Sequence, residues 1–219
     1  MEIKLKTEPI KYIDNLIKRY PVLEDQKENI ICFYDMIKEC YGRGGKVLIA
    51  GNGGSAADAE HMVGELMKNF RIERMLDKEF ADELVKVDSE LGTTLANGLE
   101  GALPAIALDG HYALTTAYMN DNDPQLCFAQ QVNGLGEQKD VFLGISTSGN
   151  SLNVLLAAVT ARAKGMRVLG LTGAKNNKLS TFCDACIKVP GKESYIIQEL
   201  HLPIYHCICM MLEDEFFGK

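Results

Sequence analysis

Residues 140–151, DVFLGISTSGNS, decide the fold of this chain. The apolar run Val-Phe-Leu-Gly-Ile is typical of a short strand that is buried on both faces of a sheet. It ends in a turn rich in glycine and hydroxyl side chains, after which a helical pattern runs from Leu152 to about Lys164. A strand, a glycine turn and a helix in this order predict an α/β fold with a parallel sheet.

The turn itself carries four hydroxyl side chains within six residues, on Ser146, Thr147, Ser148 and Ser151. Such a turn offers hydroxyl and backbone N–H donors, together with the positive end of a helix dipole, to a single anion. A serine-rich helix cap is the alternative, but a cap needs fewer hydroxyls. We therefore expect a phosphate-binding loop. It lacks the lysine of a P-loop, so a nucleoside triphosphate is the weaker prediction.

Further apolar runs predict the rest of the sheet. They cover residues 46–51, 103–108, 167–173 and 185–190. Helical patterns separate the runs, and others cover about 10–41, with a break at Pro21, and 195–217. This alternation predicts a doubly wound, five-stranded parallel sheet with helices on both faces and ligands at the carboxyl ends of the strands.

One segment interrupts the alternation of strands and helices. Residues 71–100 are rich in charge, lack proline and carry Leu, Val and Phe at roughly helical spacing. This pattern predicts one or two added helices rather than a linker. We expect a single domain over residues 1–219, in which about 1–45 is a helical N-terminal part and about 71–100 is an insertion.

Composition argues against several classes of function. The chain has 219 residues, with 23 basic and 30 acidic side chains and a net charge of −7. A surface that neutralises nucleic-acid phosphates needs the opposite sign. No window approaches the roughly 20 apolar residues of a membrane span, and charges interrupt the apolar residues near the N-terminus, so a signal peptide is not expected. These features predict a cytoplasmic protein that binds neither nucleic acid nor membrane.

The cysteines give a weaker signal. There are seven, an odd number, which argues against a disulfide framework. Cys183 and Cys186 form one CxxC motif, which is compatible with half a zinc site or a redox pair. No second CxxC accompanies it, and we interpret these two residues as structural thiols.

The turn after the first strand, Gly51-Asn-Gly-Gly-Ser55, is the second candidate ligand site. It lacks the GxGxxG spacing of a dinucleotide site, but its glycines let a ligand approach the backbone and Asn52 adds a polar group. In the helix that follows, His61 and Glu65 are four residues apart and share one face. A lone helical histidine is more often structural. Paired with a carboxylate beside a ligand-binding turn, it is a candidate metal or acid–base group.

The last helical segment mixes polar and apolar side chains. Its polar residues include Gln198, Glu199, His201 and His206. Pro203 costs about 3 kcal/mol or more inside a helix, which implies a kink or a late helix start. Because His206 precedes the apolar run Cys-Ile-Cys-Met-Met-Leu, residue type alone favours a buried structural histidine at this position.

These motifs together resemble one family. GNGGS, HxxxE over 61–65, GISTSGNS and QExH with a second histidine at 206 resemble the phosphoheptose isomerases, which have the sugar isomerase (SIS) fold. Asn120 and Asp121 resemble the Asn-Asp pair that contacts substrate in that family. The resemblance covers the chain from about Lys46 onward except for 71–100, which is longer than the usual connection in the family.

The resemblance implies an activity and a site. The activity is an aldose–ketose isomerisation, through an enediol, that converts sedoheptulose 7-phosphate to D-glycero-D-manno-heptose 7-phosphate in the biosynthesis of nucleotide-activated heptose. A homotetramer with active sites between subunits and one zinc ion per subunit is also implied. The implied substrate contacts are Asn52, Gly53, Gly54, Asn120, Asp121 and Gln198, with Ser146, Thr147, Ser148 and Ser151 on the phosphate. The implied zinc ligands are His61, Glu65, Gln198 and His206, of which Glu65 and His206 are also the acid–base pair.

Two points stay open at the level of the sequence. Gln198 and His206 are eight residues apart, about 12 Å along a continuous helix, so both reach one ion only if a kink at Pro203 or a neighbouring subunit brings them together. Two other functions compete with the heptose isomerase. One is a SIS-fold adaptor that binds the bacterial replication initiator, and the other is an isomerase of a different phosphosugar.

Overall fold

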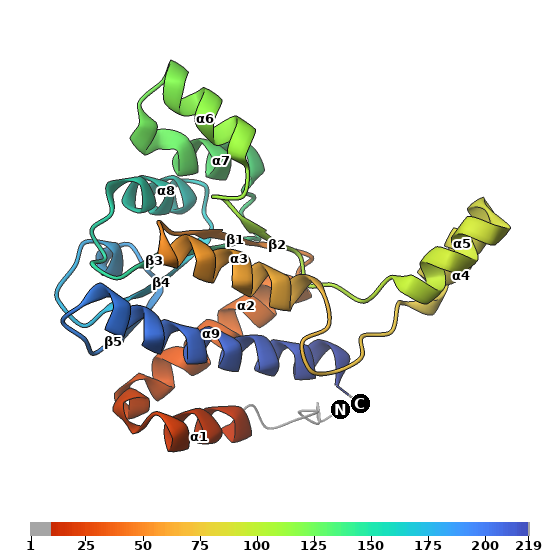
Figure 1. Ribbon diagram of the computed structural model, residues 1–219, viewed down its shortest axis with the longest axis horizontal. Coiled ribbons are helices and arrows are strands. Elements are labelled where there is room, and N and C mark those ends of the chain that lie inside the picture. The colour runs from red at the N-terminus through yellow and green to blue at the C-terminus, as the bar shows by residue number, and fades with distance from the viewer. Residues whose placement is uncertain (1–9, 219) are drawn as a thin grey trace.

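The computed structural model describes residues 10–218 (Figure 1). The first nine residues and the last residue of the expected domain, including the start of its N-terminal part, lie outside the described residues. Five strands form one parallel sheet in the order β2-β1-β3-β4-β5. They are β1 (Val47–Ala50), β2 (Ala105–Ala107), β3 (Val141–Ser146), β4 (Arg167–Gly173) and β5 (Ala185–Val189). The predicted α/β fold with a doubly wound parallel sheet is confirmed.

The strand order positions the two glycine turns side by side. The chain moves from β1 outward to β2 and then returns to β3 on the other side of β1, so the winding direction reverses between β1 and β3. In open α/β sheets the crevice at such a reversal is where ligands bind. The turn at 51–55 follows β1, and the hydroxyl loop at 146–151 follows β3.

Helices cover both faces of the sheet (Figure 1). One apolar cluster joins the sheet to α1 (Ile10–Arg19), α2 (Lys27–Gly42), α3 (Gly54–Met67) and α9 (Ser194–Phe217). The other joins it to α7 (Cys127–Leu135) and α8 (Leu152–Ala163). The helix α9 continues through Pro203, so the late helix start that this proline could have imposed is not observed.

Shorter elements complete the chain. They are η1 (Pro21–Gln26), α6 (Tyr112–Asp121), η2 (Pro124–Leu126) and η3 (Leu179–Thr181). The break expected at Pro21 is where η1 begins. Among the described residues, no helix is long and apolar enough to cross a membrane.

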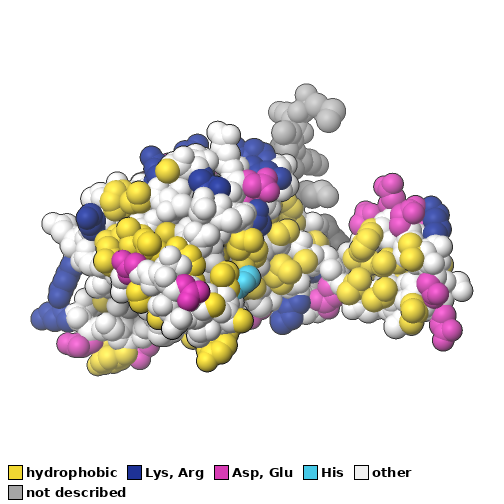
Figure 2. All heavy atoms as spheres, turned by 90° about the horizontal axis from the view of Figure 1, so that it is seen from above, with side chains coloured by type: hydrophobic (Ala, Val, Ile, Leu, Met, Phe, Trp, Pro, Cys, Tyr) yellow, Lys and Arg dark blue, Asp and Glu magenta, His cyan; other side chains and the backbone are white. Residues whose placement is uncertain are grey.

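The segment 71–100 forms a helical arm that extends from the body (Figure 1). Its helices, α4 (Lys78–Val87) and α5 (Ser89–Gly98), are joined by a single residue, Asp88, whose carboxylate accepts hydrogen bonds from two backbone N–H groups at the start of α5. The added helices expected here are confirmed. Apolar side chains gather on the arm (Figure 2), and Val87 and Leu91 are 87% and 66% exposed.

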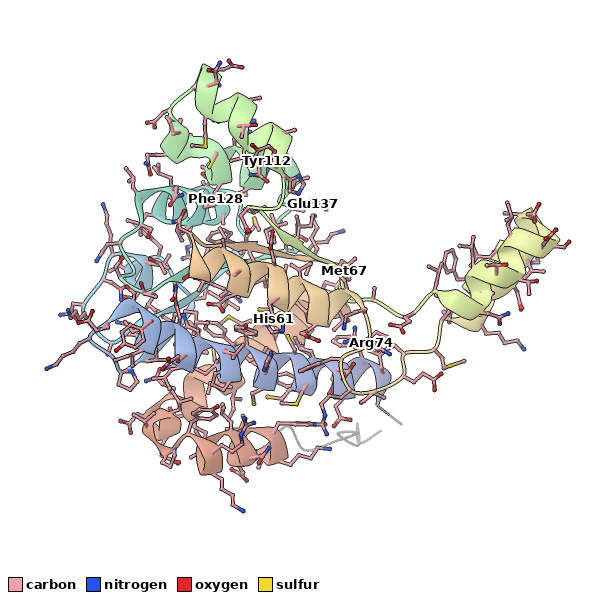
Figure 3. All side chains as sticks on the ribbon, in the orientation of Figure 1. His61, Met67, Arg74, Tyr112, Phe128 and Glu137 are labelled. Carbon is pink, nitrogen blue, oxygen red and sulfur yellow. The ribbon has the colours of Figure 1, made fainter. Side chains whose placement is uncertain are left out.

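A buried ion pair fixes the root of the arm to the body. The guanidinium of Arg74, with its side chain fully buried, lies 2.9 Å from the carboxylate of Glu213 on α9. It also donates to the backbone carbonyls of Leu66 (2.6 Å) and Glu65 (2.7 Å) at the last turn of α3. Arg74 therefore ties the arm to the end of the helix that carries Glu65 and His61 (Figure 3).

Candidate active site

The hydroxyl loop after β3 is folded around its own hydrogen bonds. Ser146 is buried, and its hydroxyl lies 3.0 Å from that of Ser151 and accepts the Gly149 N–H at 3.1 Å. Gly149 has φ +62°, a conformation that favours glycine. Ser151 is the N-cap residue of α8, but its hydroxyl makes no capping hydrogen bond to that helix. Capping therefore does not account for these hydroxyls.

The loop borders a cavity of about 210 Å³. Thr147 and Ser148 line it, and Thr147 donates to the hydroxyl of Ser194, the first residue of α9, at 3.2 Å. Two lysines that the sequence analysis did not single out, Lys175 and Lys192, also line the cavity. Their position could have been predicted, because they follow β4 and β5 and so lie at the same edge of the sheet as the loop. Two ammonium groups and the N-terminus of α9 make this cavity suited to an anion.

The first glycine turn faces the hydroxyl loop. Asn52 exchanges two side-chain hydrogen bonds with Asn153 of α8, at 2.9 and 2.8 Å. Gly53, at φ +56°, caps α3, and the side-chain amide of Gln198 occupies the space where a Cβ on Gly54 would lie. These contacts bring Asn52, Gly54 and Gln198 to the carboxyl edge of the sheet, and their contact with a ligand stays a prediction.

A second group of polar side chains lies between α3 and α9. The Nε2 atom of His61 is 3.1 Å from Glu65 Oε1 and 3.4 Å from Nε2 of His206. The side chain of Glu65 is 12% exposed and that of His61 is 44% exposed, so this cluster is open on one side. His206 lines a separate cavity of about 210 Å³ between α1 and α9. It is half-buried in this cluster, which does not fit the fully buried histidine that residue type favoured.

The cluster has a donor set that fits zinc. One ligand atom from each of His61, Glu65 and His206 lies within 4.8 Å of the other two. Two imidazoles and a carboxylate with an open fourth position are typical of catalytic zinc sites. The second oxygen of Glu65 is buried without a hydrogen-bond partner, and the nearest cation, the Lys68 ammonium, is 3.9 Å away. Two facing imidazole nitrogens and an unpaired carboxylate oxygen all favour a bound cation.

A tyrosine and a second carboxylate support His61 from behind. The buried Tyr205 donates its hydroxyl to Asp58 at 3.3 Å and lies 3.0 Å from Nδ1 of His61. Burial raises the pKa of Asp58 to about 6, and the hydrogen bond from Tyr205 and the charge of His61 act in the opposite direction. Burial also lowers the pKa of His206, with the neighbouring His61 adding to that effect. Sequence reasoning missed Asp58 and Tyr205, although Asp58 lies one turn before His61.

Other predicted residues lie away from this cluster within one chain. Gln198 packs on Gly54 at the start of α3, seven residues before His61, or about 10 Å along the helix. Asn120 donates to Asp121 at 2.9 Å at the exposed end of α6, in the outer layer beyond α8 (Figure 1). One chain thus brings together three of the four predicted zinc ligands. Separately, it brings the hydroxyl loop together with Asn52, Gly54 and Gln198.

The two parts of the site are far apart along α9. Ser194, which contacts the hydroxyl loop, and His206, in the cluster, are twelve residues apart, or about 18 Å along the helix. The anion cavity and the cluster are therefore separate features of a single chain.

Comparison with known proteins first gives the class. Two SIS domain models match the chain, over residues 11–101 and 101–208. The sheet, the hydroxyl loop and these matches define a SIS-domain protein.

Individual relatives are more specific. The chain is 39% identical to the phosphoheptose isomerase of Aneurinibacillus thermoaerophilus over 82% of its length and 77% of the relative. It is 37% identical to phosphoheptose isomerase 2 of Campylobacter jejuni over 95% of its length and 92% of the relative. A solved phosphoheptose isomerase from Francisella tularensis superimposes with a TM-score of 0.73 at 30% identity, covering 94% of this chain and 96% of that one. The chain belongs to the phosphoheptose isomerase family.

Proposed function

We propose that the protein is an aldose–ketose isomerase that converts sedoheptulose 7-phosphate to D-glycero-D-manno-heptose 7-phosphate, within the biosynthesis of nucleotide-activated heptose. The observation that carries the proposal is the cluster of His61, Glu65 and His206, because it joins possible proton-transfer groups and a metal site in a member of this family. The cytoplasmic location of the protein stays a prediction of the sequence.

The reaction moves a proton between C1 and C2 of the sugar through an enediol. It needs one group to accept a proton and another to return one near neutral pH, and we assign these roles to Glu65 and His206. Burial lowers the pKa of His206 and so favours its neutral imidazole, the form that accepts a proton. Glu65 is placed by the last turn of α3, which Arg74 holds through two backbone carbonyls.

Zinc is the cofactor that we assign to this cluster, with one ion per subunit. His61, Glu65 and His206 would hold it, and Gln198 is the fourth predicted ligand. When bound, zinc polarises the carbonyl oxygen of the substrate and so favours loss of the neighbouring proton.

The phosphate is assigned to the hydroxyl loop. Ser146, Thr147, Ser148 and Ser151 are the proposed ligands, with Asn52, Gly53, Gly54, Asn120 and Asp121 on the sugar. Lys175 and Lys192 add positive charge to the same cavity. Binding energy from this remote group would position C1 and C2 against the acid–base pair.

The assignment of both ends of the substrate implies assembly. Ser194, which contacts the loop, and His206 are about 18 Å apart along α9. This distance exceeds the length of a seven-carbon sugar phosphate. We infer that the loop of one subunit and the cluster of a neighbouring subunit form each site, within a homotetramer. The same arrangement would bring Gln198 of a neighbouring subunit, and Asn120 and Asp121, to the cluster.

The test uses purified protein and sedoheptulose 7-phosphate, with and without added zinc, and detects the aldose product. We expect turnover in the wild type and none in Glu65→Gln or His206→Asn, with the fold of both variants intact by circular dichroism. A wild-type rate in either variant would remove that residue from the mechanism. Turnover of a shorter or longer phosphosugar instead would replace the heptose substrate.

An adaptor that binds the replication initiator is not favoured. An adaptor does not need His61, Glu65 and His206 within reach of one ion, whereas an isomerase uses them. Absence of turnover, together with binding of the initiator, would support the adaptor.

A further inference from the structure

The CxxC motif lies outside the proposed active site and is not explained by it. Cys183 precedes β5 and Cys186 is its second residue, and both side chains are half-buried. A Cβ on Gly170 of β4 would lie 2.7 Å from the sulfur of Cys183 and 3.2 Å from that of Cys186. Both sulfur atoms therefore lie over the same glycine, which leaves them the space to meet.

From this juxtaposition we propose that Cys183 and Cys186 form a redox-active dithiol, oxidised to a disulfide by low-molecular-weight disulfides such as glutathione disulfide. The half-buried position admits such a reagent, whereas Cys40, Cys207 and Cys209 are buried in the core. This interpretation replaces that of two structural thiols.

The environment favours Cys186 as the attacking sulfur. The Cys183 thiol beside it lowers the pKa of Cys186, Thr172 and Lys188 act in the same direction, and burial acts in the opposite direction. The neighbouring Cys186 and burial raise the pKa of Cys183. A thiol with a pKa near the ambient pH is well suited to attack a disulfide.

The thiol–disulfide exchange takes place in two steps. The Cys186 thiolate attacks one sulfur of glutathione disulfide, the S–S bond breaks, and one glutathione leaves as a thiolate that takes up a proton. Cys183 then loses its proton and attacks the Cys186 sulfur, which forms the internal disulfide and releases the second glutathione. Two protein thiols are oxidised and one glutathione disulfide is reduced to two thiols.

The dithiol is connected to the phosphate-binding loop. Cys183 donates its S–H to the carbonyl of Leu179 at 3.2 Å, and the N–H of Leu179 donates to the carbonyl of Gly149 at 2.9 Å. Asn177, which packs against Gly149, donates to Thr172 Oγ1, and this oxygen lies 3.7 Å from the Cys186 sulfur. Oxidation removes the S–H donor, so the disulfide should loosen η3 and the loop that it supports.

The test for the dithiol is titration of the purified protein with glutathione disulfide, followed by peptide mapping. We expect a Cys183–Cys186 disulfide in the wild type and in Cys32→Ser. In Cys183→Ser the reaction should stop at a glutathione adduct on Cys186, and in Cys186→Ser neither product should form. Cys32 is the matched comparison, because it is also half-buried but burial raises the pKa of its thiol. No 183–186 linkage, or glutathionylation of Cys32 as fast as that of Cys186, would overturn the proposal.

The test for the connection to the loop is hydrogen–deuterium exchange of reduced and oxidised protein. Peptides that cover 146–151 and 177–181 should exchange roughly two- to fivefold faster after oxidation, the factor that loss of one weak hydrogen bond gives, and dithiothreitol should reverse the change. Equal exchange in a protein with the disulfide formed would overturn the connection. Neither measurement depends on isomerase activity.

Discussion

At the scale of single residues, the contrast between His201 and His206 shows what sequence can predict about a histidine. Residue type favoured burial for His206, yet His201 is the fully buried one and His206 is half-buried. Five residues in a helix correspond to a rotation of about 140°, so the two rings point to different sides of α9. Because α9 is apolar on most of its surface, the sequence alone does not show which side faces the cluster.

The hydroxyl of Tyr205 is expected to set the tautomer of His61. If it donates to Asp58, it accepts the proton on Nδ1 of His61, and Nε2 then keeps its lone pair for a metal. We predict that Tyr205→Phe weakens zinc binding by about 10- to 100-fold, measured on metal-free protein by competition with a chromophoric chelator. Tyr34→Phe, which removes a hydrogen bond to Glu215, is the control and should leave the affinity unchanged.

Two outcomes of this measurement separate the hypotheses. An unchanged affinity in Tyr205→Phe would show that the tyrosine does not position His61. A wild-type protein that binds no zinc would instead contradict the assignment of the metal itself.

His201 should make the fold sensitive to acid. Its ring lies against the backbone of Thr172, neither nitrogen has a well-formed hydrogen bond, and burial lowers its pKa to about 4 from the usual 6.5. Below pH 6.5 the unfolded chain therefore binds a proton that the folded chain does not, and stability falls as the pH falls from 6.5 towards 4. Between pH 7 and pH 5 the loss from this residue is roughly 2 kcal/mol.

Urea unfolding at pH 7 and pH 5 measures this effect. The variant His201→Leu should lose less stability over that interval than the wild type, by about the same roughly 2 kcal/mol. Asp58 remains in both proteins, so its own titration cancels in the comparison. Equal losses in the two proteins would show that His201 is not the source of the acid sensitivity.

At the scale of elements, burial explains which parts of the fold could be predicted. The strands β1 and β3 are buried along their whole length, so they stand out in the sequence as short apolar runs. The helix α6 has no buried residue, and it gave no periodic apolar pattern by which it could be recognised. The helices of the arm were predicted because residues 71–100 carry Leu, Val and Phe at roughly helical spacing and lack proline, but the sequence did not show that the arm leaves the body.

The arm should fold as an addition that the body does not need. Its two helices pack on each other, and the backbones of Arg74 and Gly101 are hydrogen bonded at its root, so a short linker can close the gap. We predict that replacement of residues 78–98 by a Gly-Ser linker changes the free energy of unfolding by less than about 1 kcal/mol, measured with urea.

Arg74→Met is the comparison for the arm deletion. It leaves the carboxylate of Glu213 buried without its ion-pair partner and should cost about 3–5 kcal/mol. A deletion as destabilising as this substitution would show that the arm packs on the body.

At the scale of the whole molecule, the proposed site is divided between two places on one chain. The sequence predicted both parts through their motifs, GISTSGNS and HxxxE with His206, because each part is a local pattern. The sequence did not show that the start of α9 contacts the hydroxyl loop through Ser194, and this contact is what separates the loop from His206 along the helix. If the site is divided, each active site needs residues from two neighbouring subunits. If the site lies within one chain, each subunit is active without residues from its neighbour.

Two inactive variants should therefore restore activity when they assemble together. Ser148→Asp places a carboxylate in the hydroxyl loop and should repel the phosphate, and His206→Asn removes the proposed acid–base group. If each site takes its loop from one subunit and its cluster from another, random co-assembly of equal amounts leaves about a quarter of the sites with both parts intact. Co-expressed variants should then show about a quarter of the wild-type rate, while the same variants purified separately and mixed without exchange of subunits show none. No activity in verified mixed assemblies would mean that each site lies within one chain, and that α9 or the loop must move to bring its parts together.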